Sequence, residues 1–526
     1  MDSQENLQVE DPSSHPKHVV VVLLDSLNRH LLGAYGGREF TTPNLDRFAE
    51  KSVVFENHHT GSLPCMPARH DLLVGALDFP WRPWGSVEIW EDAITFALRQ
   101  AGVTTMLVSD HPHLFECGGE NYHIDFDAWE YVRGHENDPW KTRPDPSWIG
   151  TPALPVDEPR RGHFKYQDSR TWFKSEEDFP GPQTMQAAVR WVITNAGHHE
   201  RSLLVVDEFD PHEPFDTPEP WASMYREQGD DPWMIWPPYV IDGLKNGLIT
   251  EEEGRSLRAA YGAKLSMIDH WFGKLLDAID SSPDSDETAV IICTDHGHYL
   301  GEFDVWGKPG FPIHNTLGHI PMMIRWPGIE PRREQALTTT VDIHATLCDI
   351  YEISVDHRTH GRSLVPLVKQ KVSGVRDHCL SGYWGREVQL VTQDYTYTRG
   401  SVGDGFPLSM WSNRWSTMPV HSRPDIRLPR PDQRAYLDAM PGSSVPVIRQ
   451  PFMQGDFLPF WAYGGLKNEN LLFDRNVDPG ELDNLAAVHG TVQTDVEKSL
   501  VQRLKEALLE INAPNDVLER LGLLGN

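Results

Sequence analysis

The chain has 526 residues, of which 39% are hydrophobic and 24% are charged, a balance that is typical of folded globular proteins and excludes an intrinsically disordered chain. Its length predicts two or three units, or one large α/β domain with an appendage. The formal net charge of −30 disfavours nucleic acid and acidic membrane surfaces as partners, and it means that an anionic substrate must be attracted by a local basic pocket.

The N-terminal residues are polar and acidic, and they lack the basic region that precedes the apolar core of a secretory signal. The apolar run at residues 19–24 is too short to span a membrane, and no other run approaches membrane length. The five cysteines are spaced too widely for a zinc cluster or a disulfide scaffold; they are Cys65, Cys117, Cys293, Cys348 and Cys379. We therefore expect a cytoplasmic protein that does not bind a membrane.

Apolar segments with the character of buried strands alternate with helical patterns through the first two-thirds of the chain. The predicted strands are residues 19–24, 103–108, 203–206, 289–293 and 320–326. The predicted helices are residues 91–101, 185–196 and 257–280, together with a short helix that has Thr42 as its N-cap and Pro43 at its first position. This alternation predicts a large, mainly parallel sheet with helices on both faces, in which ligands collect beyond the carboxyl ends of the strands.

Two stretches, residues 134–182 and 403–452, are rich in proline and show no clear period. Loops of this length usually carry function or mediate contacts, and the second stretch is a candidate contact surface for a homo-oligomer. After about residue 376 the pattern changes to short strands at residues 388–392 and 395–399, followed by a final helix at residues 496–511. We therefore predict a large α/β domain over residues 1–375 and a smaller antiparallel subdomain over residues 376–526.

One segment has the residues of an anion site at the start of a helix. Cys65 comes two residues before Pro67 and four before Arg69. Pro67 suits a first helical turn, and the apolar residues at 72, 73, 76 and 77 repeat at helical spacing. Cys65 would therefore lie where unpaired amides and the helix dipole favour an anion, with the cation of Arg69 one turn away.

Acidic or histidine-bearing turns follow directly on three of the predicted strands. They are Asp25 with Ser26, residues 207–214, and Asp295 with His296. Asp25, Asp295 and His296 offer two carboxylates and an imidazole at one end of the sheet. This oxygen-rich set fits Ca²⁺, Mg²⁺ or Mn²⁺ better than a metal that prefers thiolates.

Several ordered motifs carry a resemblance to a known family. They are the segments at residues 21–36, 42–46 and 65–69 (Cys-Met-Pro-Ala-Arg), and then those at 294–302, 306–308, 320–328, 361–364 and 472–486. In this order the motifs resemble the type I sulfatases, the formylglycine-dependent enzymes of the alkaline phosphatase superfamily. The resemblance spans nearly the whole chain. It implies an alkaline-phosphatase-like α/β fold whose larger domain is catalytic, with a small C-terminal subdomain.

The resemblance also implies a cofactor and a nucleophile. In this family the cysteine of the motif is oxidised to a formylglycine aldehyde by a maturation enzyme. Asp25, Asp295, His296 and formylglycine 65 would bind one divalent metal, Ca²⁺, Mn²⁺ or Mg²⁺. One hydroxyl of the hydrated aldehyde, held ionised by the metal and Arg69, would attack the sulfur of a sulfate ester, and the second hydroxyl would then expel sulfate.

Three further roles come from the same resemblance. Lys308 would hold the sulfate oxygens and neutralise their developing charge. His212 would donate a proton to the leaving oxygen. His113 would assist the second step, and the neighbouring His111 fits that position nearly as well, so the choice between the two stays open.

The chain departs from the common pattern where many sulfatases have two successive aspartates and a later asparagine. Here the residues are Asp25-Ser26 and His296. These changes resemble the phosphonate monoester hydrolase and phosphodiesterase branch, and they shift the expected metal preference towards Mn²⁺ or another transition metal. Whether Ser26 contributes a ligand stays open. Our first hypothesis is that the protein hydrolyses small sulfate esters. The second is that the same site acts on phosphonate or phosphate esters. The third is that the protein is an inactive homologue that binds an anion or a metal.

Overall fold

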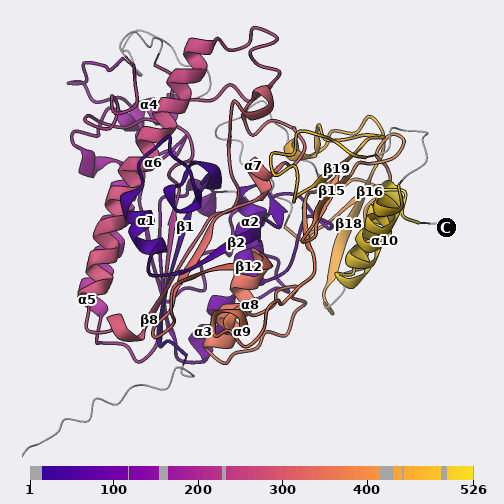
Figure 1. Cartoon of the computed structure of the whole chain (residues 1–526), viewed down its shortest axis with the longest axis horizontal. Helices are drawn as coiled ribbons and strands as arrows, with labels where there is room; N and C mark the ends of the chain where they lie inside the picture. The colour runs from indigo at the N-terminus through magenta and orange to yellow at the C-terminus, as the bar shows by residue number, and fades with distance from the viewer. Residues whose placement is uncertain are drawn as a thin grey trace, which may run out of the picture.

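A computed structural model describes residues 15–116, 118–152, 154, 164–227, 233–414, 430–440, 443–486 and 494–524. Cys117 and most of the polar N-terminal segment lie outside these residues. Figure 1 shows a large sheet with helices on both sides, and the smaller sheets of the C-terminal part packed beside it. The predicted architecture of a large, mostly parallel sheet with a smaller, mostly antiparallel part is therefore confirmed.

The central sheet has eight strands in the order β12-β2-β11-β8-β1-β6-β4-β5, and all are parallel except β11. Their bounds are β1 His18–Leu24, β2 Val53–His59, β4 Thr104–Ser109, β5 Ala128–Tyr131, β6 Ser202–Glu208, β8 Thr288–Cys293, β11 Met322–Arg325 and β12 Arg332–Thr339. The inner strands β1, β6 and β8 are buried along their whole length, as expected where helices cover both faces.

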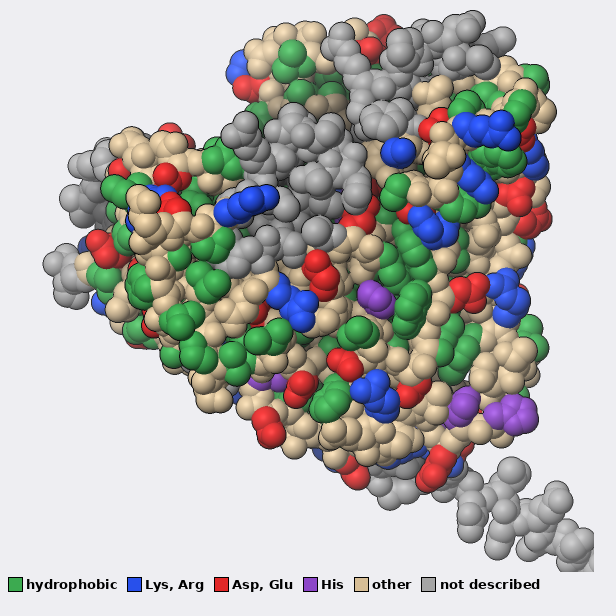
Figure 2. All heavy atoms as spheres, turned by 180° about the vertical axis from the view of Figure 1, so that it is seen from behind, with side chains coloured by type: hydrophobic (Ala, Val, Ile, Leu, Met, Phe, Trp, Pro, Cys, Tyr) green, Lys and Arg blue, Asp and Glu red, His purple; other side chains and the backbone are tan. Residues whose placement is uncertain are grey.

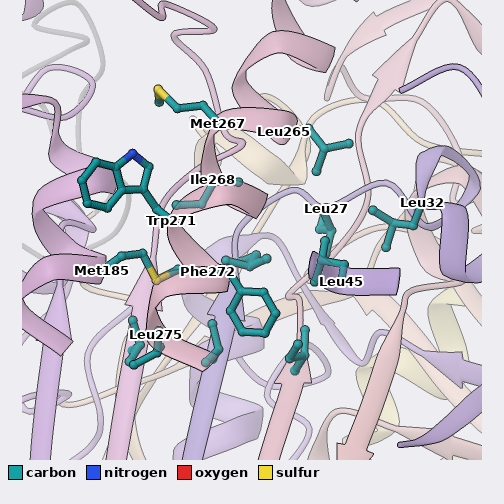
Figure 3. Close-up of a cluster of buried hydrophobic side chains, with 14 of the residues drawn as sticks. Leu27, Leu32, Leu45, Met185, Leu265, Met267, Ile268, Trp271, Phe272 and Leu275 are labelled. Carbon is teal, nitrogen blue, oxygen red and sulfur yellow. The ribbon is translucent and has the colours of Figure 1, made fainter. Parts of the chain in front are cut away.

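Successive residues of β1 pack into two separate hydrophobic cores, because side chains alternate between the two faces of a strand. Val20 and Val22 belong to one apolar cluster, and Val19 and Val21 to another on the opposite face. The first face is covered by α1 (Pro43–Ala49), α5 (Pro180–Asn195) and α6 (Glu251–Asp280), whose apolar side chains are drawn in Figure 3. The second is covered by α2 (Cys65–Val74), α3 (Ile94–Gln100), α8 (Val341–Ile350) and α9 (Val365–Val368).

Helix boundaries differ from the predicted ones where side chains make other contacts. Helix α6 starts earlier than predicted because Thr250 and Glu253 form a reciprocal capping box. Helix α3 starts later, since Glu91 is bound to buried Arg82 and His70 instead of opening the helix. Within the described residues no helix is both long enough and apolar enough to cross a membrane.

The C-terminal part is built on a five-stranded sheet in the order β19-β15-β14-β13-β3. Its bounds are β3 Ser62–Leu63, β13 Cys379–Tyr383, β14 Val388–Val391, β15 Tyr395–Arg399 and β19 Asn470–Asp474. Helix α10 (Asp495–Glu510) packs its apolar side chains into the same cluster as those of the sheet, and α11 (Asn515–Arg520) follows it. Strand β3 pairs with β13 and ends two residues before Cys65, so the C-terminal sheet supports the start of α2.

The two stretches without a clear period contain regular structure. Residues 403–452 include a three-stranded antiparallel sheet of β16 (Leu408–Trp411), β17 (Tyr436–Ala439) and β18 (Pro446–Phe452). Residues 134–182 include α4 (Phe164–Arg170) and the start of α5. The prediction of long irregular loops was wrong there because these strands and α4 are too short to give a clear period, and because β16 pairs with β18 across a long segment of chain.

A last small sheet lies near the carboxyl edge of the central one. It consists of β7 (Val240–Ile241), β10 (Val305–Gly307) and β9 (Tyr299–Leu300), and α7 (Asn315–Gly318) follows it in the chain. Tyr239 directly precedes β7 and Lys308 directly follows β10. The small sheet thus places two polar side chains next to the ends of the central strands.

Candidate active site

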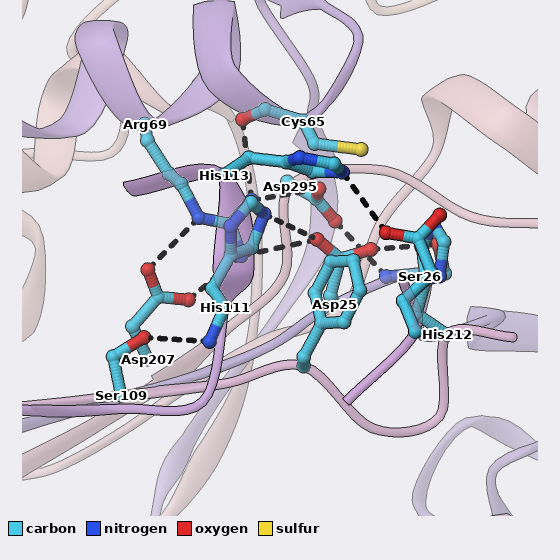
Figure 4. A network of polar contacts seen from close by, with 12 residues as sticks. Asp25, Ser26, Cys65, Arg69, Ser109, His111, His113, Asp207, His212 and Asp295 are labelled. Atoms are coloured by element: carbon cyan, nitrogen blue, oxygen red, sulfur yellow. Dashed lines mark hydrogen bonds and ion pairs between the residues drawn. The ribbon is translucent and has the colours of Figure 1, made fainter. Parts of the chain in front are cut away.

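The residues predicted as metal ligands meet at the carboxyl edge of the central sheet. Asp25 follows β1, and Asp295 follows its neighbour β8 after one further residue. The ligand atoms of Asp25, Cys65, Asp295 and His296 all lie within 4.8 Å of one another, and all four side chains are buried. Figure 4 shows Asp25, Asp295 and Cys65 pointing toward this centre from three elements.

Hydrogen bonds orient two of these side chains. His296 Nδ1 lies 2.9 Å from the carbonyl oxygen of Gly297 and donates to it, so Nε2 faces the group, 3.3 Å from Cys65 Sγ. Burial, helped by nearby Lys308, lowers the pKa of His296 to about 4 against the opposing effect of Asp295, so the ring is neutral at pH 7. A neutral imidazole is the form that binds metals.

Asp295 is held by the backbone on one side. Its Oδ1 accepts from the backbone N–H groups of Ser26 at 3.0 Å and His296 at 2.8 Å. Burial opposes its ionisation, but His296 and Arg69 outweigh that effect and lower the pKa of Asp295. The carboxylate is therefore charged, with Oδ2 directed to the centre of the site.

Arg69 connects three carboxylates beneath this centre. It forms a bidentate interaction with Asp207, in which Nε donates to Oδ2 at 2.9 Å and Nη2 donates to Oδ1 at 2.7 Å. The same guanidinium reaches Asp25 Oδ2 at 3.0 Å and Asp295 Oδ2 at 3.1 Å. Burial disfavours its charge, but Asp207 and Asp25 more than compensate and raise its pKa. Arg69 is thus a fixed cation that positions both metal-site carboxylates.

The residues fit a divalent cation. Burial, and then the charge of Asp295, raise the pKa of Asp25 well above its usual range, while Arg69 and Lys308 act in the opposite direction. A bound cation would supply the positive charge that this carboxylate needs in order to ionise. Two carboxylates, one neutral imidazole and an atom at position 65 form a donor set suited to Ca²⁺, Mg²⁺ or Mn²⁺.

Cys65 is placed for this chemistry, but its thiol is not activated. Burial, and then Asp25 and Asp295, raise the pKa of the thiol well above its usual range despite Lys308 and Arg69. A reactive cysteine requires a thiolate, which this environment disfavours. The position is therefore better suited to an oxygen nucleophile than to sulfur.

Lys308 provides a second buried cation at the site. Its Nζ donates to Ser26 Oγ at 3.1 Å, and Ser26 Oγ donates to Asp25 Oδ1 at 2.8 Å. Burial lowers the pKa of Lys308, but Cys65, Glu213 and Asp25 outweigh burial and raise it. Ser26, whose backbone has φ of 61°, thus bridges the lysine and a metal-site carboxylate.

The two candidate histidines after β4 differ sharply. Both ring nitrogens of His113 face carboxylates, Nδ1 at 3.2 Å from Glu116 and Nε2 at 3.1 Å from Glu136. Burial works against the charged ring, but Glu136 and Glu116 raise the pKa of His113 to about 10. Among the described residues His111 has no hydrogen-bond partner at either nitrogen, and its Nε2 lies 3.7 Å from Asp25 Oδ2. Burial, and then Arg69, hold its pKa well below the usual range.

His212 lies in the turn after β6. Its Nδ1 donates to the backbone carbonyl of Glu213 at 2.8 Å, which directs Nε2 away from that turn. Its ring stacks on Phe209 with 4.2 Å between centroids, and Phe209 also contacts the rings of His111, His113 and His135. The phenyl ring therefore gathers imidazoles from three segments at one edge of the sheet.

Sequence reasoning missed three side chains near the site, Glu136, His135 and Glu213. Glu136 binds His113, and His135 Nε2 lies 2.7 Å from Asp210. Their loop follows β5, which is an exposed edge strand without the apolar run of its neighbours. The available signal was a polar cluster at residues 133–138. It could be placed only once β5 was known to end at the same edge.

The surface and the site differ in charge. On the face shown in Figure 2, Lys and Arg side chains are interspersed with acidic and apolar ones. The cations that could attract an anion to the site are instead the buried Arg69 and Lys308. Any attraction for an anionic substrate must therefore come from within the site, where Asp25, Asp207 and Asp295 lie beside Arg69 and a bound metal ion would add positive charge.

A comparison with protein families identifies the chain. The model described as Sulfatase matches residues 17–353, which is more than half of its length. The chain belongs to the sulfatase family. The match contains every residue of the site described above, from Asp25 to Lys308.

Similar proteins include both sulfatases and a related hydrolase. A choline-sulfatase of Rhizobium meliloti is 28% identical over 374 residues, covering 67% of this chain and 71% of that protein. An arylsulfatase of Clostridium perfringens is 23% identical over 403 residues, covering 69% of this chain and 80% of that protein. The solved structure of a phosphonate monoester hydrolase of Agrobacterium radiobacter aligns with a TM-score of 0.61 and 17% identity over 95% of both chains. This likeness confirms the expected alkaline-phosphatase-like fold.

Proposed function

We propose that this sulfatase-family chain hydrolyses small sulfate esters at residue 65, after conversion of Cys65 to formylglycine and with one divalent metal ion. The observation that carries the proposal is the convergence of Asp25, Asp295, His296 and Cys65 within 4.8 Å, with Arg69 reaching both carboxylates. A choline-sulfatase and an arylsulfatase among the similar proteins support it.

The metal, held by Asp25, Asp295 and His296, would supply Lewis-acid stabilisation of an oxygen at residue 65. A formylglycine hydrate at that residue would supply one hydroxyl as nucleophile and a second to release sulfate. A maturation enzyme that generates formylglycine is then a required partner.

Side chains of the protein would bind the sulfate, position the metal ligands and protonate the leaving oxygen. Lys308 is placed to bind sulfate oxygens and to neutralise charge that develops on them, because its ammonium group is buried beside the site. Arg69 keeps the carboxylates in position. His212 would protonate the leaving oxygen through Nε2, since its Nδ1 is engaged with the carbonyl of Glu213.

Of the two histidines after β4, we assign the proton transfer of the second step to His111. Its ring is neutral and unpartnered among the described residues, so a nitrogen lone pair is available for a proton, although burial and Arg69 keep its pKa low and make it a weak base. His113 is held protonated by two glutamates and cannot act as a base near pH 7. It would instead add positive charge near the substrate.

The alternative function is hydrolysis of phosphonate monoesters or phosphodiesters at the same site. The phosphonate monoester hydrolase among the structural neighbours and the Asp25-Ser26 and His296 pattern favour it. His296 is a softer ligand than an amide oxygen and favours Mn²⁺ over Ca²⁺. Both reactions place one negatively charged group against Lys308 and Arg69.

The test begins with protein produced together with a formylglycine-generating enzyme. Mass spectrometry of the residue 65 peptide measures conversion, and rates on an aryl sulfate, an aryl phosphonate and an aryl phosphodiester are then compared with those of Cys65→Ala. A dominant sulfate rate supports the first function, and a dominant phosphonate or phosphodiester rate supports the alternative. Converted protein that cleaves none of the three would leave only the inactive homologue.

A further inference from the structure

Glu213 is a buried carboxylate beside the leaving-group histidine, and the proposed mechanism gives it no part. The residue is 5% exposed and lies in the turn after β6. Two side chains from other elements hold it. The Tyr239 hydroxyl donates to Oε1, and His298 Nε2 lies 3.3 Å from Oε2.

The same carboxylate faces His212. Oε2 of Glu213 lies 3.5 Å from His212 Nδ1, the nitrogen that donates to the Glu213 backbone carbonyl at 2.8 Å. Glu213 thus offers two acceptors to one N–H group, a carbonyl and a charged oxygen. This fixes the tautomer of His212 with its exchangeable site at Nε2.

The other charged and titratable groups around His212 oppose its protonation. Lys308 from the end of β10, His135 from the loop after β5 and His111 from the turn after β4 all interact with it. Burial acts in the same direction, and together with Lys308 and His135 it holds the pKa of His212 well below its usual range; of these groups Glu213 alone favours the charged ring. Burial also disfavours the charge of Glu213 itself, but His212, Lys308 and His298 outweigh it and keep its pKa well below the usual range.

We propose that Glu213 is a positioning residue that orients His212 and supplies the counter-charge for its imidazolium when the leaving oxygen needs a proton. Without this carboxylate, a protonated His212 would be a buried cation facing Lys308 with no anion at its Nδ1 side. Such a charge is costly in a protein interior unless it is paired. The inference rests on the proposed function, because it concerns the departure of the same ester.

The surroundings keep the carboxylate in place. Gly307 has φ of 78°, and a Cβ there would lie 2.4 Å from Tyr239 Cδ1, so the glycine allows the tyrosine ring to approach. The phenol then binds one carboxylate oxygen and leaves the other for His212 and His298. Glu213 is therefore held by two neighbouring segments and is not a freely rotating side chain.

The test compares wild type, Glu213→Gln, His212→Gln and the double variant on two aryl esters. One has an activated phenol that leaves without a proton, and the other has an unactivated phenol. Glutamine keeps the shape and the acceptor for Tyr239 but removes the charge. We expect Glu213→Gln to lower kcat about 10- to 100-fold on the unactivated ester and less than about 3-fold on the activated one. The basic limb of its pH profile should move to lower pH.

The double variant separates positioning from a structural role. If Glu213 acts through His212, Glu213→Gln changes the rate of His212→Gln by less than about 2-fold, because the two residues share one function. Tyr239→Phe keeps the charge and loosens the carboxylate, so its loss on the unactivated ester should be smaller than that of Glu213→Gln. Equal losses on both esters, or losses that multiply in the double variant, overturn the proposal.

The comparison stays valid whichever ester the enzyme prefers. It uses the sulfate, phosphonate or phosphodiester series that the wild type cleaves, so a wrong choice between these groups does not affect it. If the wild type cleaves none, the proposed function fails, and histidine-labelled ¹⁵N spectra still test Glu213. The protonated fraction of His212 at pH 5 should be larger in wild type than in Glu213→Gln, and equal fractions overturn the inference.

Discussion

Nη2 of Arg69 lies 3.0 Å from Oδ2 of Asp25, and this ion pair joins helix α2 to the end of strand β1. Because the same guanidinium also binds Asp207 and Asp295, one side chain sets the spacing of the metal-site carboxylates. The guanidinium can serve all three because it is planar and has five donors in a fixed geometry.

Arg69→Lys should therefore inactivate the enzyme although it keeps the charge. An ammonium group cannot contact three carboxylates with the same geometry, so we expect kcat to fall by about 100- to 1000-fold. The measurement is turnover of the preferred aryl ester, with melting temperature as the control for folding. Lys274→Arg, on the outer face of α6, is the matched control and should leave turnover unchanged. Wild-type turnover in Arg69→Lys would contradict the assignment.

His111 and His113 should give different kinetic defects. His111→Gln removes the neutral base, so we expect the second step to slow by about 100-fold and a rapid initial burst of phenol to precede slow turnover. His113→Gln removes a positive charge near the substrate and should weaken kcat/KM without a burst. Stopped-flow measurement of phenol release distinguishes them. A burst in His113→Gln and none in His111→Gln would reverse the assignment.

The ion pair of His113 should make part of the stability dependent on pH. Its pKa in the folded chain is about 10, above the ordinary value of about 6.5, because Glu136 and Glu116 outweigh burial. The folded state therefore binds this proton more tightly than the unfolded state. The resulting stability is fully present below about pH 6.5 and is lost as pH rises through about 10.

Denaturant unfolding of wild type and His113→Gln at several pH values measures this effect. The difference in the free energy of unfolding should be largest at pH 6 and should shrink steadily towards pH 10. Glu136→Gln removes one partner of the same pair and should reproduce part of the trend. A difference that grows with pH would show that His113 is neutral in the folded protein.

The unconverted Cys65 thiol should be nearly inert. Because burial and the adjacent Asp25 and Asp295 raise its pKa, little thiolate is present at pH 8. Iodoacetamide labelling followed by mass spectrometry should modify Cys65 far more slowly in the native protein than in denaturant, in the presence of a chelator. Converted protein should instead react at residue 65 with a hydrazide. Equal labelling rates in native and denatured protein would refute the buried, protonated thiol.

The sequence was sufficient for some residues of the site and not for others, for physical reasons. Asp25 and Asp295 each end an apolar strand, and parallel strands bring such ends to one edge, so their meeting followed from periodicity and topology. Cys65 and Arg69 are one helical turn apart on α2, which also follows from spacing. These contacts depend on regular elements whose patterns are visible in a single chain.

Glu136 and Glu213 could not be found in this way. The strand before Glu136 is an exposed edge strand, and within residues 403–452 β16 pairs with β18 across a long segment of chain. The choice between His111 and His113 depended on whether carboxylates occupy the ring nitrogens, and one of those carboxylates comes from the loop after β5. Such contacts arise from tertiary packing and leave no local period.

The metal preference of the site should depend on His296. His296 contributes an imidazole where an amide oxygen would favour harder ions, so we expect wild type to bind Mn²⁺ more tightly than Ca²⁺. His296→Asn should lower Mn²⁺ affinity by about 10- to 100-fold while Ca²⁺ affinity changes less, so that the ratio of the two affinities moves towards Ca²⁺.

Metal titrations of chelator-treated protein, followed by melting temperature, measure both affinities without requiring turnover, since a ligand that binds only the folded state stabilises it. His111→Gln, which alters a neighbouring imidazole outside the ligand group, is the control and should leave the ratio unchanged. A ratio that is the same in wild type and His296→Asn would remove His296 from the metal site and leave Asp25, Asp295 and residue 65 of the group described here.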